Sequence, residues 1–345
     1  MRFRPLGRTG LSVSEYCLGT MNFGGPTDEA EAREITAVAK DAGINFIDTA
    51  DVYTGGKSEE ITGRLIGKAR QDWVLASKSG NWLGTGENDG GLSRKWLLNA
   101  LDNCLERLGT DYLDIWYLHI DDRRTPFEEI CATVDMAVRS GKVRYWGFSN
   151  FMGWQAVEFM RVADALGTLR PSVTQPCYNA FNRQIEVDLL PACAHFQVGV
   201  VPYSPLARGV LTGKYLPDQE PEEGTRAARK DKRMMETEFR RESLVLAQEL
   251  KAYAEKSGRS PSDFAMQWVL NNKLVSSVLI GPRTTGQLKA YLASLDTSFS
   301  EEDEAFLSSL VSSGHTSTPN FSDPRYPYTG RQPKVGTMPE ARVRS

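Results

Sequence analysis

The stretch Ile44-Asn45-Phe46-Ile47-Asp48-Thr49-Ala50-Asp51-Val52-Tyr53 decides the predicted fold. It opens with an apolar run of strand length, which follows a helical pattern over residues 29–42 and the helix-stopping Gly43. The predicted strand ends at Asp48. A carboxylate at the carboxyl end of a buried parallel strand leaves the packed region and enters the mouth, where α/β barrels place their chemistry. Tyr53 follows in the predicted loop.

The same alternation of strand and helix patterns continues along the chain after an N-terminal hairpin over residues 3–13. We predict strands at 16–18, 44–48, 73–78, 113–119, 143–149, 173–178, 198–203 and 275–280, and helices at 29–42, 58–67, 93–107, 126–139, 153–166, 186–195, 242–256, 261–271 and 285–294. Repeated units of this kind favour parallel strands closed into a (β/α)8 barrel, the TIM barrel. The predicted α/β barrel domain covers 1–314 and has a long loop after its seventh strand. An irregular C-terminal tail, 315–345, follows and is not a separate domain.

A doubly wound sheet is the competing α/β architecture, and it requires a glycine fingerprint directly after its first strand. The nearest match, Gly84-Thr-Gly86-Glu-Asn-Asp-Gly90, has one residue too many and carries two acids. Gly56-Lys57-Ser58 is similar to the end of a phosphate-binding loop, but Asp51 stands where that motif needs its first glycine. We therefore keep the barrel, and predict Ser58 as a helix N-cap with Glu59 in the first turn.

Composition and charge exclude several classes of function. Of the 345 residues, 40% are hydrophobic and 25% charged, and the formal net charge is -3. This balance gives no basic field for nucleic acid or an anionic membrane, so we predict neither partner. The basic run over 226–233 lacks interleaved aromatic residues, which favours a solvated loop or a strap over a cofactor. The 5 cysteines show no Cys-x-x-Cys spacing, which argues against disulfides and a metal site. The absence of an apolar leader predicts a cytoplasmic protein.

Polar side chains fall at the carboxyl ends of neighbouring predicted strands. Strand 73–78 ends in Lys78, and strand 113–119 ends in His119. Because side chains alternate along a strand, Asp48, Lys78 and His119 each share the inward face with apolar neighbours and converge at one rim with Tyr53. A lone lysine at a strand end is usually a solvated cap, and a lone histidine is usually structural. The combination favours a functional site.

Several motifs, in the expected order, resemble those of the aldo-keto reductase superfamily. They are Asp48-Thr-Ala-x-x-Tyr53, Gly56-x-Ser58-Glu59, Lys78, Leu118-His119, Gly147-Phe-Ser149-Asn150, Gln175-Pro-Cys-Tyr-Asn179 and Tyr203-Ser-Pro-Leu-Ala-Arg-Gly209-Val-Leu-Thr-Gly-Lys214. The long insert after the seventh strand is similar to that of the branch that includes bacterial reductases and the potassium-channel β subunits. It looks less like the mammalian aldose-reductase branch.

The resemblance implies reduction of an aldehyde or ketone carbonyl to an alcohol, or the reverse, by hydride transfer from a nicotinamide and without a metal. It assigns Tyr53 as general acid, Lys78 as the cation that tunes the tyrosine, Asp48 as the residue that orients Lys78, and His119 as a donor to the carbonyl oxygen. A phenol pKa near ~10 must fall by a few units to match neutral pH, and a nearby cation provides such a shift.

The predicted cofactor is NADP(H), with NAD(H) as an alternative. Barrels often bind phosphate with the loops after strands seven and eight, here 204–240 and 281–287. An arginine at the adenosine end suits a 2'-phosphate. By resemblance, the cofactor contacts are Gly19, Thr20, Met21, Asp48, Ser149, Asn150, Gln175, Tyr203, Ser204, Pro205, Leu206, Ala207, Gly209, Lys214, Arg226, Gly281, Arg283 and Gln287. Tyr291 replaces a family residue that reaches adenine, which leaves it either a stacking role or a packing role.

The substrate is predicted only as a small carbonyl compound or alcohol. Residues placed just beyond strand ends are candidates to contact it: Phe23, Tyr53, Trp82, His119 and Phe151. The tail 315–345 either covers the mouth or contacts another subunit, and the protein is a monomer or a homo-oligomer. Two alternatives to the reductase stay open: a nucleotide-binding regulatory or redox-sensing subunit with weak turnover, and a lyase that forms a Schiff base on Lys78.

Overall fold

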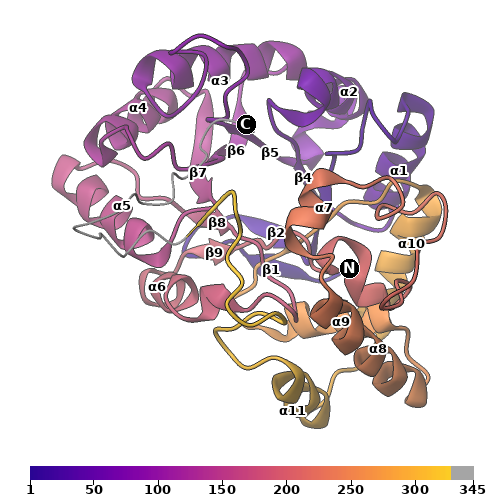
Figure 1. Ribbon diagram of the computed structural model, residues 1–345. Coiled ribbons are helices and arrows are strands. Elements are labelled where there is room, and N and C mark those ends of the chain that lie inside the picture. The colour runs from indigo at the N-terminus through magenta and orange to yellow at the C-terminus, as the bar shows by residue number, and fades with distance from the viewer. Residues whose placement is uncertain (328–345) are drawn as a thin grey trace.

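The structure is a computed structural model that describes residues 1–327, and its centre is a closed parallel barrel (Figure 1). The strands follow the order β10-β3-β4-β5-β6-β7-β8-β9 in an 8-stranded sheet. A parallel bridge between Val200 and Val275 joins the two ends of that order. The amide of Leu279 also donates to the carbonyl of Pro202 at 3.0 Å. The predicted (β/α)8 barrel is confirmed.

The barrel strands are short. Their bounds are β3 (Tyr16–Gly19), β4 (Phe46–Asp48), β5 (Val74–Ser79), β6 (Leu113–Leu118), β7 (Val143–Ser149), β8 (Val173–Gln175), β9 (Gly199–Val200) and β10 (Val278–Ile280). Strands β8 and β9 end earlier than predicted. Pro176 and Pro202 follow closely, and a proline has no N–H with which to continue a strand ladder.

Helices surround the barrel, and α1 to α6 form an arc around the strands in Figure 1. The helices are α1 (Glu29–Asp41), α2 (Lys57–Ile66), α3 (Arg94–Leu108), α4 (Phe127–Arg139), α5 (Gly153–Leu166), α6 (Leu189–Phe196), α7 (Lys232–Thr237), α8 (Arg241–Lys256), α9 (Pro261–Asn271), α10 (Thr285–Ala293) and α11 (Glu301–Leu310). Helices α7 and α11 were not predicted. The signal for α11 was present in the sequence, because Ser300 and Asp303 form a capping box at its start. Among residues 1–327, no helix combines the length and the apolar character needed to span a membrane.

The start of helix α2 differs from the prediction. Gly56, with a φ of 90°, is the N-cap, because glycine adopts this left-handed backbone without steric cost. Ser58 therefore lies inside the first turn, where its hydroxyl donates to the carbonyl oxygen of Thr20 at 2.7 Å. Glu59 is buried and accepts from Ser77 at 2.5 Å and from Arg107 Nε at 2.7 Å. Both residues attach the helix to the barrel and are not exposed capping residues.

The hairpin closes the amino end of the barrel. Strands β1 (Phe3–Pro5) and β2 (Ser12–Ser14) pair in antiparallel fashion. Leu6 and Val13 are fully buried and belong to one interior cluster with residues of the barrel strands. The barrel members of that cluster are Cys17, Phe46, Val74, Ala76, Ile115, Tyr117, Val173 and Val201. A second, larger cluster fills the layer between strands and helices.

The register of the strands positions the polar rim. Asp48 on β4 lies opposite Ala76, and Lys78 on β5 lies opposite Tyr117. Lys78 is therefore one inward-facing position further along the barrel than Asp48. The apolar interior ends below these two residues, and the polar mouth begins with them.

Candidate active site

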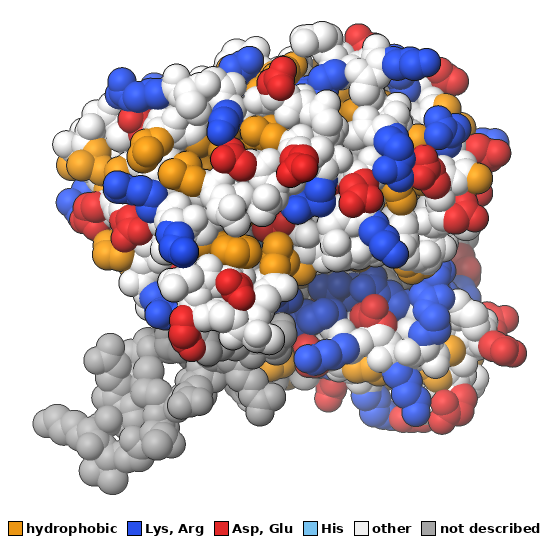
Figure 2. Space-filling view, turned by 90° about the horizontal axis from the view of Figure 1, so that it is seen from above, with side chains coloured by type: hydrophobic (Ala, Val, Ile, Leu, Met, Phe, Trp, Pro, Cys, Tyr) orange, Lys and Arg blue, Asp and Glu red, His pale blue; other side chains and the backbone are white. Residues whose placement is uncertain are grey.

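A large cavity of about 690 Å³ lies at the carboxyl ends of the strands. Its walls include the final residues of several strands, among them Gly19, Asp48, Ser149, Gln175 and Ile280. Figure 2 shows Lys and Arg side chains gathered in a hollow of the surface. Among the described residues, the cations that line the cavity are Arg208, Lys214, Arg226, Arg229, Arg233, Arg283 and Arg325.

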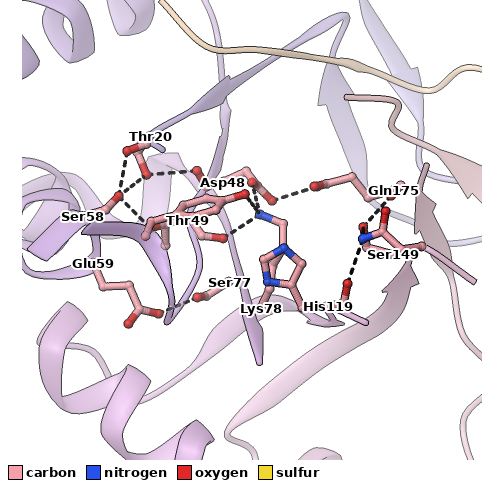
Figure 3. A network of polar contacts seen from close by, with 12 residues as sticks. Thr20, Asp48, Thr49, Ser58, Glu59, Ser77, Lys78, His119, Ser149 and Gln175 are labelled. Atoms are coloured by element: carbon pink, nitrogen blue, oxygen red, sulfur yellow. Dashed lines mark hydrogen bonds and ion pairs between the residues drawn. The ribbon is translucent and has the colours of Figure 1, made fainter. Parts of the chain in front are cut away.

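Lys78 is fully buried, and Figure 3 shows it within a network of polar contacts. Its ammonium forms an ion pair with Asp48 and donates to the carbonyl oxygen of Thr49 at 2.8 Å and to the hydroxyl of Tyr53 at 3.1 Å. Burial alone lowers the pKa of Lys78, but the nearby Asp48 and Tyr53 raise it, and the net pKa is above its ordinary value. Lys78 therefore keeps its proton at neutral pH, which argues against a Schiff-base role.

Asp48 is held from the other side by Gln175. The Nε2 of Gln175 donates to Asp48 Oδ2 at 2.9 Å, while Lys78 contacts Oδ1. The carbonyl of Gln175 accepts from the hydroxyl of Ser149 at 2.6 Å. Both carboxylate oxygens thus have fixed donors, and the position of Lys78 follows from them.

Tyr53 enters from the loop after β4. Its ring meets the ring of His119 edge-on, with 6.0 Å between centroids. Burial raises the pKa of Tyr53 more than Lys78 lowers it, so the net pKa is above the ordinary value. The predicted lowering by Lys78 is therefore present as a contribution, but the predicted net direction is wrong. In this structure the phenol carries its proton at neutral pH.

His119 follows the end of β6. Its backbone amide donates to the carbonyl of Ser79 at 2.8 Å, and its carbonyl accepts from Asn150 Nδ2 at 2.9 Å. The pKa of the imidazole is lowered well below its ordinary value by burial, then by Lys78 and Arg325. A neutral imidazole retains one N–H, which can donate to an oxygen in the cavity.

Next to the predicted catalytic residues, the side chains of Ser149, Asn150 and Tyr203 form hydrogen bonds with one another. Asn150 Nδ2 also donates to the hydroxyl of Ser149 at 3.0 Å, and the hydroxyl of Tyr203 donates to Asn150 Oδ1 at 2.8 Å. Asn150 and Ser204 have φ values of 65° and 58°, in the left-handed region that non-glycine residues rarely adopt. Such backbone strain is typical of functional sites.

The far end of the cavity is built by the loop after β9 and by the start of α10. Arg208, Lys214, Arg229 and Arg283 line it, and within residues 1–327 none of them has a carboxylate within 4 Å. By contrast, Arg226 pairs with Asp231 at 3.1 Å. A cavity bordered by cations without counterions fits a ligand that carries phosphates, and the donor set therefore fits a dinucleotide.

Most of the predicted cofactor contacts line this cavity, and two do not. Thr20 turns away and its hydroxyl bonds with Ser58 at 2.8 Å, while Ala207 is fully buried. Tyr291 lines the cavity, which favours the stacking role left open by the sequence.

Three aromatic residues predicted as substrate contacts do not line the cavity. Phe23 is fully buried in the outer core. Phe151 packs against Phe159, with ring centroids 5.3 Å apart, and Trp82 packs against Gly90. Phe23 and Phe151 turn back into the core between strands and helices, and the structure brings none of the three to the cavity.

The sequence did not reveal several residues that the structure adds to the cavity. Asn81, Arg325 and Tyr326 lie with Tyr53 and His119 in the same cavity wall. Arg325 and Tyr326 belong to the aperiodic tail, where no pattern predicts a position. Elsewhere along the cavity the additions include Arg208, Thr212, Arg229, Asp231, Arg233, Ser262, Asp263 and Met266. Arg229 and Arg233 belong to the basic run 226–233, which predicted a strap over the cofactor. That run could therefore have identified them as residues of the cavity.

Comparison with known proteins agrees with the geometry. Residues 15–311 match a family model described as the Aldo/keto reductase family. The chain is 38% identical over 314 residues to "Uncharacterized oxidoreductase YrpG" of Bacillus subtilis (strain 168), covering 88% of this chain and 93% of the relative. It is 37% identical over 301 residues to a "Probable voltage-gated potassium channel subunit beta" of Oryza sativa subsp. japonica, covering 86% and 92%. A protein of the same name from Arabidopsis thaliana is 36% identical over 301 residues, with the same coverage of 86% and 92%.

Proposed function

Because the chain belongs to the aldo/keto reductase family, we propose that this oxidoreductase uses NADP(H) to reduce aldehyde or ketone carbonyls to alcohols, or to catalyse the reverse reaction. One observation carries the proposal: the ammonium of Lys78 touches both Asp48 and the hydroxyl of Tyr53, 3.1 Å away, at the wall of a cavity. Such an arrangement has the parts needed to deliver a proton to an oxygen in the cavity.

The chain supplies the proton and the electrostatic stabilisation. Tyr53 donates its phenolic proton to the oxygen of the carbonyl as that oxygen gains negative charge. The phenolate left behind faces Lys78 at 3.1 Å, which remains charged because Asp48 holds it. His119 donates its N–H to the same carbonyl oxygen and so polarises the bond. The nicotinamide, when bound, supplies the hydride to the carbonyl carbon.

The far end supports a phosphorylated cofactor. Arg283 is anchored through its backbone, because its amide donates to Gln287 Oε1 at 2.8 Å and its carbonyl accepts from Thr27 at 2.9 Å. Its guanidinium has no ion pair in the described chain and lines the cavity. A guanidinium binds a phosphate monoester through paired hydrogen bonds, so we propose NADP(H) over NAD(H).

A second candidate is a nucleotide-binding regulatory subunit with weak turnover. It is favoured by the printed names of two relatives, which are 37% and 36% identical to this chain. The complete set of Asp48, Tyr53, Lys78 and His119 favours the enzyme.

A substrate panel tests the proposal and separates the two candidates. Aldehydes, ketones and alcohols would each be mixed with the protein and either NADP(H) or NAD(H), and the absorbance of the reduced nicotinamide followed. We expect turnover with NADPH and simple aldehydes. Tight nucleotide binding without consumption across the whole panel would reject the reductase and favour the regulatory subunit.

A further inference from the structure

The chain segment 321–327 is fastened over the catalytic end of the cavity. Asp323 forms an ion pair with Arg233 at 2.6 Å, and the carbonyl of Phe321 accepts from Gln184 at 3.1 Å. Arg123 donates to the carbonyl of Pro327 at 3.3 Å. These contacts come from separate parts of the barrel, so the segment has a defined position.

Arg325 in this segment is a cation without a counterion. Its Nη2 donates to Asn81 Oδ1 at 2.8 Å, and within residues 1–327 no carboxylate lies within 4 Å of its guanidinium. The neighbouring cations are neutralised, because Arg233 pairs with Asp323 and Glu236, and Arg123 lies 3.9 Å from Asp121. Arg325 thus differs from its neighbours Arg233 and Arg123 and, like the far-end cations, is left without a carboxylate partner.

Arg325 acts at the end of the cavity where the chemistry is proposed. Its partner Asn81 follows Lys78 by three positions and is 5% exposed. Arg325 is also one of the charges that disfavour protonation of His119. Arg325, Asn81 and Tyr53 line the same cavity.

Asn81 adds a second donor at this point. Its Oδ1 is used by Arg325, and its Nδ2 has no acceptor within the described part of the chain. The free N–H groups of a guanidinium and of an amide side by side match the oxygens of a carboxylate or a phosphate.

We propose that the carbonyl substrate carries an anionic group, a carboxylate or a phosphate, which Arg325 and Asn81 bind while its carbonyl faces Tyr53 and His119. This inference rests on the carbonyl reduction proposed above and names its substrate class. The anion completes the ion pair that the described chain leaves open, and it fixes the distance between the anionic group and the reacting carbon.

Matched aldehydes test the inference. The probes are 4-carboxybenzaldehyde, its neutral methyl ester, and 4-formylphenyl phosphate, each assayed with NADPH and the full-length protein. We expect kcat/KM for the acid or the phosphate to exceed that for the ester by about 10- to 100-fold, the range of one or two charge-assisted hydrogen bonds. The ratio between the two anionic probes identifies the preferred anion.

Variants at the mouth assign the effect to its source. Arg325→Met is expected to lower kcat/KM for the anionic probe about 10- to 100-fold more than for the ester. Asn81→Asp, which places a carboxylate beside the retained guanidinium, is expected to remove the preference as well. Arg123→Met is the control, because Arg123 also holds the segment but does not line the cavity. It should leave the preference in place.

Each other result has a definite meaning. Equal rates for acid and ester in the natural protein, or equal losses for both in Arg325→Met, would overturn the anion site while leaving carbonyl reduction intact. Absence of turnover with every probe, the ester included, would reject carbonyl reduction and this inference with it.

Discussion

Lys78 at the catalytic end of the cavity and the cations at its far end differ in whether the protein itself neutralises them. At the catalytic end, Lys78 is fully buried and each of its donors has an acceptor, including Asp48. At the far end, Arg208, Arg229 and Arg283 line the cavity, and none has a carboxylate within 4 Å among residues 1–327. Lys78 is thus neutralised within the protein, whereas the far-end cations, like Arg325 over the catalytic end, are left open.

The difference follows from what each charge must do. A cation that tunes a proton donor must stay charged and fixed throughout turnover, and an internal carboxylate achieves this. A cation that binds an anionic ligand must be free to meet it, since an internal partner would compete. Removing the neutralised Lys78 should therefore impair chemistry and folding, while removing an open cation at the far end should impair binding alone.

Tyr53→Phe tests the catalytic end most directly. We expect kcat for aldehyde reduction to fall by about 10²- to 10⁴-fold, the range associated with loss of a general acid. NADPH affinity, measured by quenching of protein fluorescence, should change little. Tyr145→Phe is the matched control, because Tyr145 packs against the interior cluster of the barrel and its hydroxyl makes no hydrogen bond in the described chain. A Tyr53→Phe protein that keeps most of its kcat would remove the acid role.

Lys78→Met tests whether internal neutralisation matters for folding. The substitution leaves Asp48 buried without its cation, and an uncompensated buried charge typically costs about 3–5 kcal/mol. The free energy of unfolding from urea titrations at pH 7 should fall by that order. The double variant Lys78→Met with Asp48→Asn should recover part of the loss.

Arg283→Met provides the comparison from the other end of the cavity. Its removal breaks no ion pair in the described chain, so the free energy of unfolding should change by at most about 0.5 kcal/mol. Similar losses for Lys78→Met and Arg283→Met would show that the two ends do not differ as described.

Arg283→Ala tests the far end as a binding surface. Loss of hydrogen bonds to a phosphate should raise the Kd for NADPH by about 10- to 100-fold, since bonds to charged groups contribute about 1.5–3 kcal/mol. The Kd for NADH should change much less. Arg64→Ala is the control, because Arg64 pairs with Glu29 on the outer surface. Equal losses for both nucleotides would contradict a phosphate contact at Arg283.

The sequence was informative where a residue follows a regular strand. Asp48, Lys78 and His119 could be placed at one rim because alternation along the strand fixes which face each one takes. The catalytic end was therefore predictable as an arrangement, although the burial that raises the pKa of Tyr53 was not.

The sequence was uninformative where position depends on tertiary contacts alone. Arg325 reaches the cavity because ion pairs and backbone contacts hold 321–327 in place, and no local pattern encodes this. Phe23 and Phe151 pack into the core because the loops after β3 and β7 turn back toward the helices. Phe23 and Phe151 miss the cavity for that reason, whereas most of the predicted cofactor contacts, in loops as well as at strand ends, line it.

One carboxyl tests whether every buried charge of the catalytic end is neutralised. Asp51 lies between Asp48 and Tyr53 in sequence, is 1% exposed, and has no hydrogen-bond partner on either carboxylate oxygen within the described chain. Burial, and next the nearby Glu59, raise the pKa of Asp51 to about 8 from a model-compound value of 3.8. At neutral pH this side chain is therefore mainly protonated and uncharged.

The raised pKa predicts how stability depends on pH. Between the unfolded pKa of 3.8 and the folded pKa of about 8, the folded state holds a proton that the unfolded state releases. Stability therefore falls as pH rises through this window, by at most about 1.4 kcal/mol per pH unit. Asn cannot ionise, so Asp51→Asn should gain free energy of unfolding relative to the natural protein between pH 5 and pH 8. Urea titrations at the two pH values measure this gain, and the surface variant Asp102→Asn, which should show none, is the control.

If Asp51→Asn shows no gain at pH 8, Asp51 is ionised in the folded protein, and a second buried negative charge stands beside Lys78 and Tyr53. The catalytic end would then hold a buried charge without a partner, and the contrast between its neutralised buried charges and the open cations of the far end would fail.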